Sequence, residues 1–194
     1  MIRSIVVFCG SSSGTNEIYL NTAAELGKVM AERKIELVYG GAKVGLMGAI
    51  ADAVLAGGGT VRGVIPDFLR TREVAHESIT ELLEVTSMHE RKLRMHELSE
   101  AIIALPGGWG TLEELFEMMT WAQLGLHPKP IGILNVAGYY DPLIAQIGRM
   151  TDEGFLKEVY RDMVIISADI HELLTLMNDY KAPEVPKWID RSAS

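Results

Sequence analysis

The chain has 194 residues, of which 48% are hydrophobic and 23% are charged, and its formal net charge is −8. This length suits one domain with a substantial core, and no apolar run approaches the roughly 20 residues that span a bilayer, so we expect no membrane role. The acidic balance argues against the broad basic surface that non-specific nucleic-acid binding requires, so we expect a small-molecule ligand and no nucleic acid.

In chain order, short apolar segments alternate with segments of helical periodicity. Residues 2–9 are apolar and β-branched and predict a strand, and residues 17–34 repeat apolar residues at helical spacing. The alternation predicts further strands at 35–39, 60–65, 82–86, 101–105, 130–134 and 163–166, and helices at 45–56, 88–99, 111–126, 142–150 and 169–180. Such an order requires right-handed crossovers and a parallel sheet covered on both faces. We therefore predict an α/β fold with one Rossmann-like domain at 1–180, followed by a C-terminal tail at 181–194.

Three glycine-rich loops each follow a predicted strand and lead into a predicted helix: GSSSG at 10–14, GGAKVGLMG at 40–48 and PGGWGT at 106–111. Unpaired N–H groups at the start of a helix attract an anion. A glycine after a strand is about as often only a tight turn. Three such loops at the carboxyl edge of one sheet are better explained by a bound phosphate, because ligands of open α/β sheets bind at this edge.

The loops also exclude two common nucleotide sites. Leu46 follows Gly45 where a Walker A motif needs Lys and then Ser or Thr, which argues against ATP hydrolysis. The first loop is not GxGxxG, and no acid follows the strand at 60–65 to hold a dinucleotide ribose. A mononucleotide or sugar phosphate therefore fits better than NAD.

Acidic residues begin the helix after the third loop. Glu114 is at i+3 from Thr111 on the apolar side of this helix, so we expect it to point toward the loop and the interior. Glu113 instead shares a face with Glu117 and Thr120. For Glu113, simple complementation of the helix dipole explains an acid in the first turn as well as a ligand contact does.

The segment MHERKLRMHE, residues 88–97, carries three cations on a predicted helix. Arg91 and Lys92 adjoin methionines at helical spacing and are predicted to point inward, where a buried cation needs an anionic partner. Arg94 has Glu90 and Glu97 within pairing distance and is predicted to be exposed.

The sequence offers little support for other chemistry. His89 and His96 are not in HExxH spacing and no CxxC occurs, so we expect no metal and no other cofactor. GSSSG is not the GxSxG of a serine nucleophile, so its serines are better explained by phosphate hydrogen bonds or by loop chemistry. One cysteine, Cys9, cannot form an internal disulfide, and no charged leader precedes the first strand, which together favour the cytoplasm.

GGAKVGLMG, MHERK and PGGWGTLEE together resemble the LOG (Lonely Guy) family of cytokinin riboside 5′-monophosphate phosphoribohydrolases, with similarity from GSSSG to about Tyr140. Two departures are visible: Ala42 stands where a third glycine is usual, and Trp109 where Tyr or Phe is common. Ala42 is expected to narrow its loop slightly. Relatives have often been labelled possible lysine decarboxylases, but no lysine environment in this sequence indicates a pyridoxal phosphate site.

The resemblance implies a homodimeric nucleotide-binding protein that cleaves the N-glycosidic bond of an AMP-like nucleotide, N6-modified or plain, into free base and ribose 5-phosphate. It implies that Arg91 and Glu114 are the catalytic pair. The candidate substrate- and phosphate-binding residues are Gly10, Ser11, Ser12, Gly40, Gly41, Gly45, Met47, Glu73, Met88, Lys92, Pro106, Gly107, Gly108, Trp109, Gly110, Thr111, Glu113 and Thr120. The alternative is a nucleotide-binding sensor of the same fold that does not turn over its ligand.

Overall fold

The computed structural model describes residues 1–70 and 75–184. Its centre is a seven-stranded parallel sheet in the order β4-β3-β2-β1-β5-β6-β7. The strands are β1 (Ser4–Phe8), β2 (Glu36–Tyr39), β3 (Val61–Pro66), β4 (Glu81–Val85), β5 (Ala101–Ala104), β6 (Ile131–Leu134) and β7 (Val164–Ser167). The helices are α1 (Glu17–Glu32), α2 (Gly45–Ala56), α3 (Met88–Glu97), α4 (Trp109–Gln123), α5 (Asp141–Asp152), α6 (Glu158–Arg161) and α7 (Ile170–Asp179), with 3₁₀ turns η1 (Asp67–Leu69) and η2 (Val136–Gly138).

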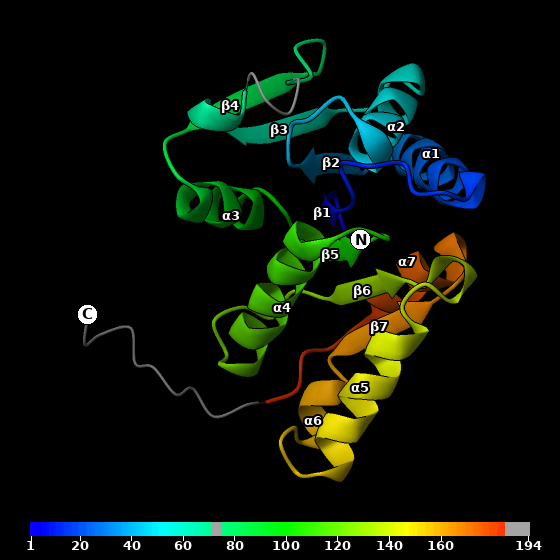
Figure 1. The fold of residues 1–194 in the computed structure, drawn as a ribbon, viewed down its shortest axis with the longest axis vertical. Coiled ribbons are helices and arrows are strands. Elements are labelled where there is room, and N and C mark those ends of the chain that lie inside the picture. Colours follow the sequence, from blue (N-terminus) through cyan, green and yellow to red (C-terminus); the bar gives the residue numbers. More distant parts are fainter. Residues whose placement is uncertain (71–74, 185–194) are drawn as a thin grey trace.

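Helices cover both faces of the sheet, as Figure 1 shows. One core cluster joins the sheet to α1, α2 and α7, and a second joins the opposite face to α3, α4 and the start of α5. Every residue of β5 and β6 is buried, so these central strands are apolar without alternation, as expected for a parallel sheet covered twice. The predicted Rossmann-like α/β fold is therefore confirmed.

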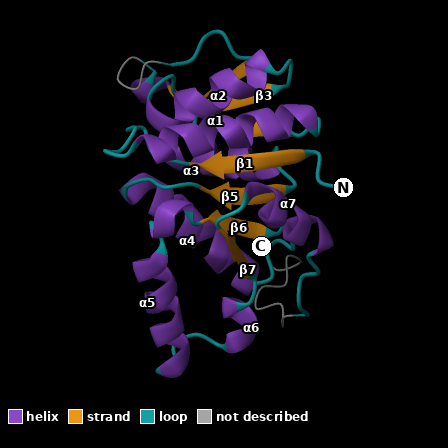
Figure 2. Ribbon diagram, turned by 90° about the vertical axis from the view of Figure 1, so that its right-hand side faces the viewer, coloured by secondary structure: helices purple, strands orange, loops and turns teal. Residues whose placement is uncertain are grey.

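The strand order places a topological switch point at the middle of the sheet. From β1 the chain proceeds outward through β2, β3 and β4, and then returns to the other side of β1 with β5, β6 and β7. In such sheets the crevice outside the carboxyl ends of the two strands at the switch point is the usual ligand site. The loops GSSSG and PGGWGT follow those two strands, β1 and β5, and Figure 2 shows their arrowheads at the same side of the sheet.

The predicted elements are all present, and their ends differ from the prediction by at most three residues. The sequence pattern did not indicate α6, η1 or η2, because segments of three or four residues are too short to show a period. Glu73 lies outside the described residues, and so does most of the tail predicted at 181–194, so the tail stays a prediction. None of the helices in the described part of the chain is long and apolar enough to cross a membrane.

Candidate functional site

Hydrogen bonds join the three glycine-rich loops. The Gly10 N–H donates to the Pro106 carbonyl at 3.0 Å, which ties the first loop to the third. The Leu46 N–H donates to the Gly10 carbonyl at 3.1 Å, which ties the second loop to the first. The loops predicted to meet at one edge of the sheet therefore do meet, with Gly10 at the junction.

The helices that follow the second and third loops begin without a side-chain cap from any described residue. The N-cap residues of α2 and α4 are Val44 and Gly108, whereas α1 and α3 begin at Asn16 and Ser87, whose side chains accept from an N–H of the first turn. A helix start needs acceptors for its first N–H groups. The starts of α2 and α4 are therefore suited to an anionic ligand, with the Leu46 N–H of α2 already bonded to the Gly10 carbonyl.

A cavity of about 190 Å³ lies at this junction. It is lined by Val7, Phe8, Cys9, Gly10, Ser11, Gly40, Met47, Arg91, Gly108, Trp109, Gly110, Thr111 and Glu114. We call it the Arg91–Glu114 cavity. The structure thus brings the two residues of the implied catalytic pair to one cavity, together with residues of all three loops.

Arg91 is held in place by backbone carbonyls. Its side chain is 5% exposed; Nε donates to the Val64 carbonyl at 3.1 Å and Nη2 to the Gly40 carbonyl at 2.9 Å. A Cβ at position 40 would lie 2.2 Å from Nη2, so the close approach of Arg91 requires glycine there. Guanidinium donors fixed in this way need no reorganisation when a ligand arrives.

Glu114 and Glu113 lie on different faces of α4, as predicted. Glu114 is half-buried and lines the Arg91–Glu114 cavity. Burial raises the pKa of the nearby Cys9 thiol, and the charge of Glu114 raises it further, so the thiol stays protonated. Cys9 therefore contributes a small uncharged wall to the cavity.

Lys92 is buried as predicted, but its partners are carboxylates of α4. Its Nζ donates to Glu113 Oε1 at 2.5 Å and to Glu117 Oε1 at 3.1 Å. Burial acts against the charged form of Lys92, but these two hydrogen bonds and charges outweigh it and raise its pKa. Lys92 and Glu113 thus form an ion-pair cluster that does not line the Arg91–Glu114 cavity.

Other predicted residues lie at different distances from this cavity. Met88 Sδ is 3.8 Å from Arg91 Nη1, so Met88 is next to the site. Thr120 is exposed, two turns further along α4 than Glu113, and its hydroxyl donates to the Phe116 carbonyl of its own helix. Arg94 is exposed and pairs with Glu97 at 2.8 Å, as predicted.

The two residues that depart from the family pattern, Ala42 and Trp109, lie in different surroundings. Ala42 is fully buried in the core and forms an isolated bridge with Ala75, and it does not line the cavity. Trp109 is 89% exposed and stands at the mouth of the cavity as the first residue of α4.

A second cavity, of about 310 Å³, adjoins the first and shares Gly10, Ser11 and Gly108 with it. We call it the tyrosine cavity. Its remaining lining residues are Ser12, Ser13, Gly14, Tyr19, Leu46, Pro106, Gly107 and Tyr139. The sequence analysis did not identify Tyr19 or Tyr139 as residues of the site. The adjacent residues Tyr139 and Tyr140, soon after the end of a predicted strand, were a signal that aromatic side chains lie at this edge of the sheet.

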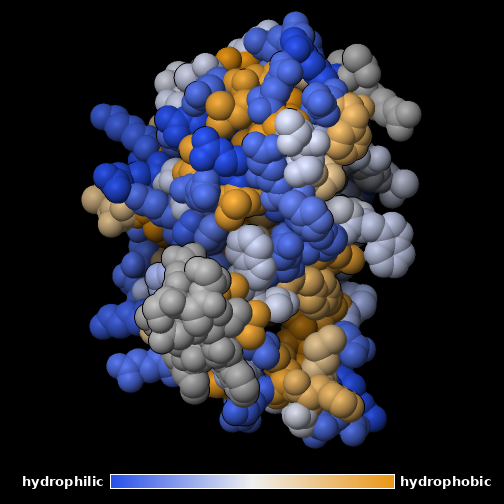
Figure 3. All heavy atoms as spheres, turned by 90° about the vertical axis from the view of Figure 1, so that its left-hand side faces the viewer, coloured by the Kyte–Doolittle hydropathy of each residue, from blue (hydrophilic) through white to orange (hydrophobic). Residues whose placement is uncertain are grey.

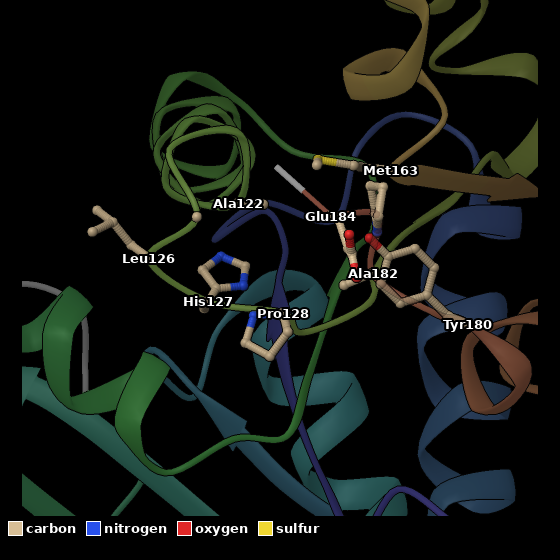
Figure 4. A pocket seen from close by; sticks show the side chains of 10 residues that line it. Ala122, Leu126, His127, Pro128, Met163, Tyr180, Ala182 and Glu184 are labelled. Atoms are coloured by element: carbon tan, nitrogen blue, oxygen red, sulfur yellow. The ribbon is translucent and has the colours of Figure 1, made fainter. Parts of the chain in front are cut away.

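Another cavity, of about 550 Å³, lies at the other end of α4 (Figure 4). Its lining includes His127 and Tyr180. The two ring nitrogens of His127 are engaged by the backbone: Nε2 lies 3.0 Å from the Met118 carbonyl and Nδ1 accepts from the Lys129 N–H at 3.1 Å. This histidine supports the loop after α4, and the glycine-rich loops are at the opposite end of the helix.

Residues 1–70 and 75–184 contain no group of three or more His, Cys, Asp or Glu side chains that could hold a metal ion. The candidate site therefore offers carboxylate, guanidinium and backbone N–H groups. With these it can bind an anion and stabilise positive charge near it.

Comparisons with known proteins identify relatives of this chain. Residues 47–177 match a family described as "Possible lysine decarboxylase". The chain is 48% identical to cytokinin riboside 5′-monophosphate phosphoribohydrolase LOG2 of Arabidopsis thaliana over 188 residues, 97% of this chain and 86% of the relative. It is 51% identical to the probable enzyme of the same name, LOGL1, of Oryza sativa subsp. japonica, over 91% of this chain and 79% of the relative.

Among solved structures, the Moco carrier protein of Chlamydomonas reinhardtii matches with a TM-score of 0.68 at 20% identity, over 92% of this chain and 97% of that one. This likeness establishes a shared fold.

Proposed function

The chain belongs to the LOG family of cytokinin riboside 5′-monophosphate phosphoribohydrolases, and on this premise we propose how its site works and on what it acts. It is an enzyme that hydrolyses the N-glycosidic bond of a nucleoside 5′-monophosphate to free base and ribose 5-phosphate. Its substrates are AMP-like nucleotides of the cytokinin type, with an adenine that carries an N6 substituent or none.

Glu114 and Arg91 carry the chemistry. As the glycosidic bond breaks, positive charge develops on the ribose, and the Glu114 carboxylate stabilises this charge and orients the attacking water. The water oxygen bonds to the sugar carbon, the bonding electrons leave with the base, and the water proton ends on the base. Arg91, fixed by the Val64 and Gly40 carbonyls, positions the nucleotide and favours the ionised form of Glu114.

The single observation that carries this proposal is the composition of the Arg91–Glu114 cavity, where both residues stand beside an uncapped helix start. The glycine-rich loops bind the 5′-phosphate, and this anchor aligns the ribose with Glu114. A sensor without turnover would not need a carboxylate beside the ribose, so an enzyme explains the composition of this cavity better than a sensor does.

The experiment is incubation of the purified protein with a panel of nucleoside 5′-monophosphates, with and without a chelator, followed by chromatography of the products. We expect free base and ribose 5-phosphate in equal amounts from AMP-like nucleotides, and the same rate with the chelator, because a carboxylate and water suffice. Binding without any release of base would support the sensor. Loss of turnover with the chelator, restored by a divalent ion, would contradict the metal-free mechanism.

We also propose that the protein acts as a homodimer in the cytoplasm. An apolar groove of about 270 Å³ runs between α4, α5 and α6, and its lining includes Phe116, Met119, Met150 and the 87% exposed Phe155. We call it the α4–α6 groove; apolar side chains gather in the lower right part of the face in Figure 3. An apolar groove open on the surface is a candidate protein–protein interface. Thr120 lines this groove, so in a dimer it would lie at the interface.

A further inference from the structure

Three consecutive carbonyls, where β5 leads into the PGGWGT loop, each accept a hydrogen bond from a residue outside the loop. The Tyr140 hydroxyl donates to the Leu105 carbonyl and the Tyr139 hydroxyl to the Gly107 carbonyl, both at 2.6 Å. The carbonyl between them, that of Pro106, accepts from the Gly10 N–H at 3.0 Å. The start of the loop is therefore held by Gly10 and by the turn that carries Tyr139 and Tyr140.

The Tyr139 bond has a consequence on the cavity side of the loop. In a trans peptide the C=O of one residue and the N–H of the next lie in one plane and point in opposite directions. Fixing the Gly107 carbonyl therefore also fixes the Gly108 N–H, which points away from Tyr139. Gly108 is the N-cap of α4 and lines the Arg91–Glu114 cavity.

The peptide between Gly107 and Gly108 has no side chain that could hold its orientation. Residues 107 and 108 are both glycine, so no Cβ opposes rotation of the plane that they share. The Tyr139 hydrogen bond to the Gly107 carbonyl is then a direct restraint on the direction of the Gly108 N–H.

The turn that presents the tyrosines is itself strained. Ala137 has φ +50° and ψ 32°, a left-handed conformation that is strained for a residue with a Cβ. Asn135 holds the turn: its Nδ2 donates to Asp141 Oδ1 and its Oδ1 accepts from the Tyr140 N–H, both at 2.8 Å. Strain of this kind persists where the surrounding structure fixes it, often beside functional sites.

We propose that Tyr139 is a positioning residue for phosphate binding: its hydroxyl holds the Gly107–Gly108 peptide so that the Gly108 N–H faces the phosphate. This inference rests on the proposed function, because it concerns the phosphate of the same substrate. Tyr139 acts through Gly108, from the tyrosine cavity, and forms no part of the reacting groups.

The test is Tyr139→Phe, which removes the hydroxyl and keeps the ring that meets Tyr19 edge-on at 5.8 Å. Tyr180→Phe, at the far end of α4, is the control that also loses one hydroxyl. Titration with inorganic phosphate and with ribose 5-phosphate should show affinity about 10-fold lower in Tyr139→Phe, with Tyr180→Phe like wild type. For a nucleoside monophosphate KM should rise by a similar factor, and cleavage of the matching riboside should not change.

A second readout does not depend on turnover. In protein labelled with ¹⁵N-glycine, phosphate should shift the Gly108 amide resonance of the wild type and of Tyr180→Phe, and should shift it much less in Tyr139→Phe. All measurements are made well below the melting temperature of each variant. Equal phosphate affinity and an equal Gly108 shift in Tyr139→Phe would overturn the proposal. If the wild type binds phosphate but cleaves no nucleotide, the proposed function fails, and the phosphate titration still decides the role of Tyr139.

Discussion

Arg91 and Lys92 are adjacent on α3, yet their side chains have different surroundings. Arg91 donates to the carbonyls of Val64 and Gly40 at the cavity, and Lys92 pairs with two carboxylates of α4. A guanidinium has five donors in a rigid fork, so it can bond to the backbone and to a ligand together. An ammonium held by two carboxylates is well suited to joining α3 to α4.

For a single residue of the cavity, we predict that Glu114→Gln lowers kcat about 100-fold or more and leaves nucleotide affinity within a few-fold of wild type. The amide keeps the shape of the side chain but lacks the charge that the transition state requires. Steady-state kinetics and equilibrium binding of the nucleotide measure the two effects separately. Glu153→Gln, which removes an exposed acid at the C-cap of α5, is the control and should behave like wild type. Turnover close to normal in Glu114→Gln would rule out the catalytic assignment.

Arg91→Ala and Arg94→Ala form a matched pair on one helix. We predict that Arg91→Ala loses at least about 100-fold in kcat/KM, because it removes a fixed cation from the cavity and leaves two buried carbonyls without this donor. Arg94 is exposed and pairs with Glu97, so its replacement should cost less than about 3-fold in kcat/KM. Similar activities in the two variants would mean that another face of α3 serves the site.

At the scale of elements, the sequence predicted the strands and the loops at their ends, because β5 and the part of β1 after Ser4 are apolar without interruption and glycines follow both strands. It also predicted the inward faces of α3 and α4. It could not predict that Lys92 meets Glu113 and Glu117, because that contact depends on how α3 and α4 pack beside each other on one face of the sheet. The strained turn at Ala137 was equally hidden, since alanine carries no signal for a left-handed conformation.

Buried histidines at the loop between α4 and β6 should make the free energy of unfolding depend on pH. Burial, with a smaller contribution from the Lys129 charge, lowers the pKa of His127 from its ordinary 6.5 to about 4, against the opposing effect of its hydrogen bond to the Met118 carbonyl. The folded state therefore prefers neutral His127, and this contribution is present above pH 6.5 and is lost as the pH falls from 6.5 toward 4. His96, whose pKa is also lowered to about 4 by burial and by Lys129, acts in the same direction.

We predict that the free energy of unfolding of the wild type falls by about 1–2 kcal/mol for His127 alone between pH 7 and pH 5. In His127→Gln the amide can keep both backbone hydrogen bonds without titrating, so this variant should lose less stability over the same range. His89→Gln, at an exposed position of α3, should keep the wild-type slope. Urea unfolding at the two pH values measures all three, and identical slopes would show that His127 does not titrate on unfolding.

At the scale of the whole molecule, the sheet order brings loops from distant parts of the chain to one crevice, and the α4–α6 groove remains open on the surface. We predict that wild-type protein sediments as a dimer at micromolar concentration. Phe155→Ser should shift it toward the monomer, because it removes a large apolar contact from the groove. Phe68→Ser, which removes an exposed phenylalanine of η1 outside the groove, should remain a dimer. A monomeric wild type, or a dimer unaffected by Phe155→Ser, would place the groove outside any interface.

The central claim is that the glycine-rich loops bind the 5′-phosphate and thereby align the ribose with Glu114. Much of the binding free energy then comes from a group remote from the broken bond, and removing that group harms catalysis as well as affinity. The decisive measurement is kcat/KM for an adenosine-type riboside and for its 5′-monophosphate at equal pH and salt. The account predicts that the riboside is cleaved at least ~100-fold less efficiently, about 2.7 kcal/mol of transition-state stabilisation. Equal values would mean that the loops serve the fold alone, and would contradict the account.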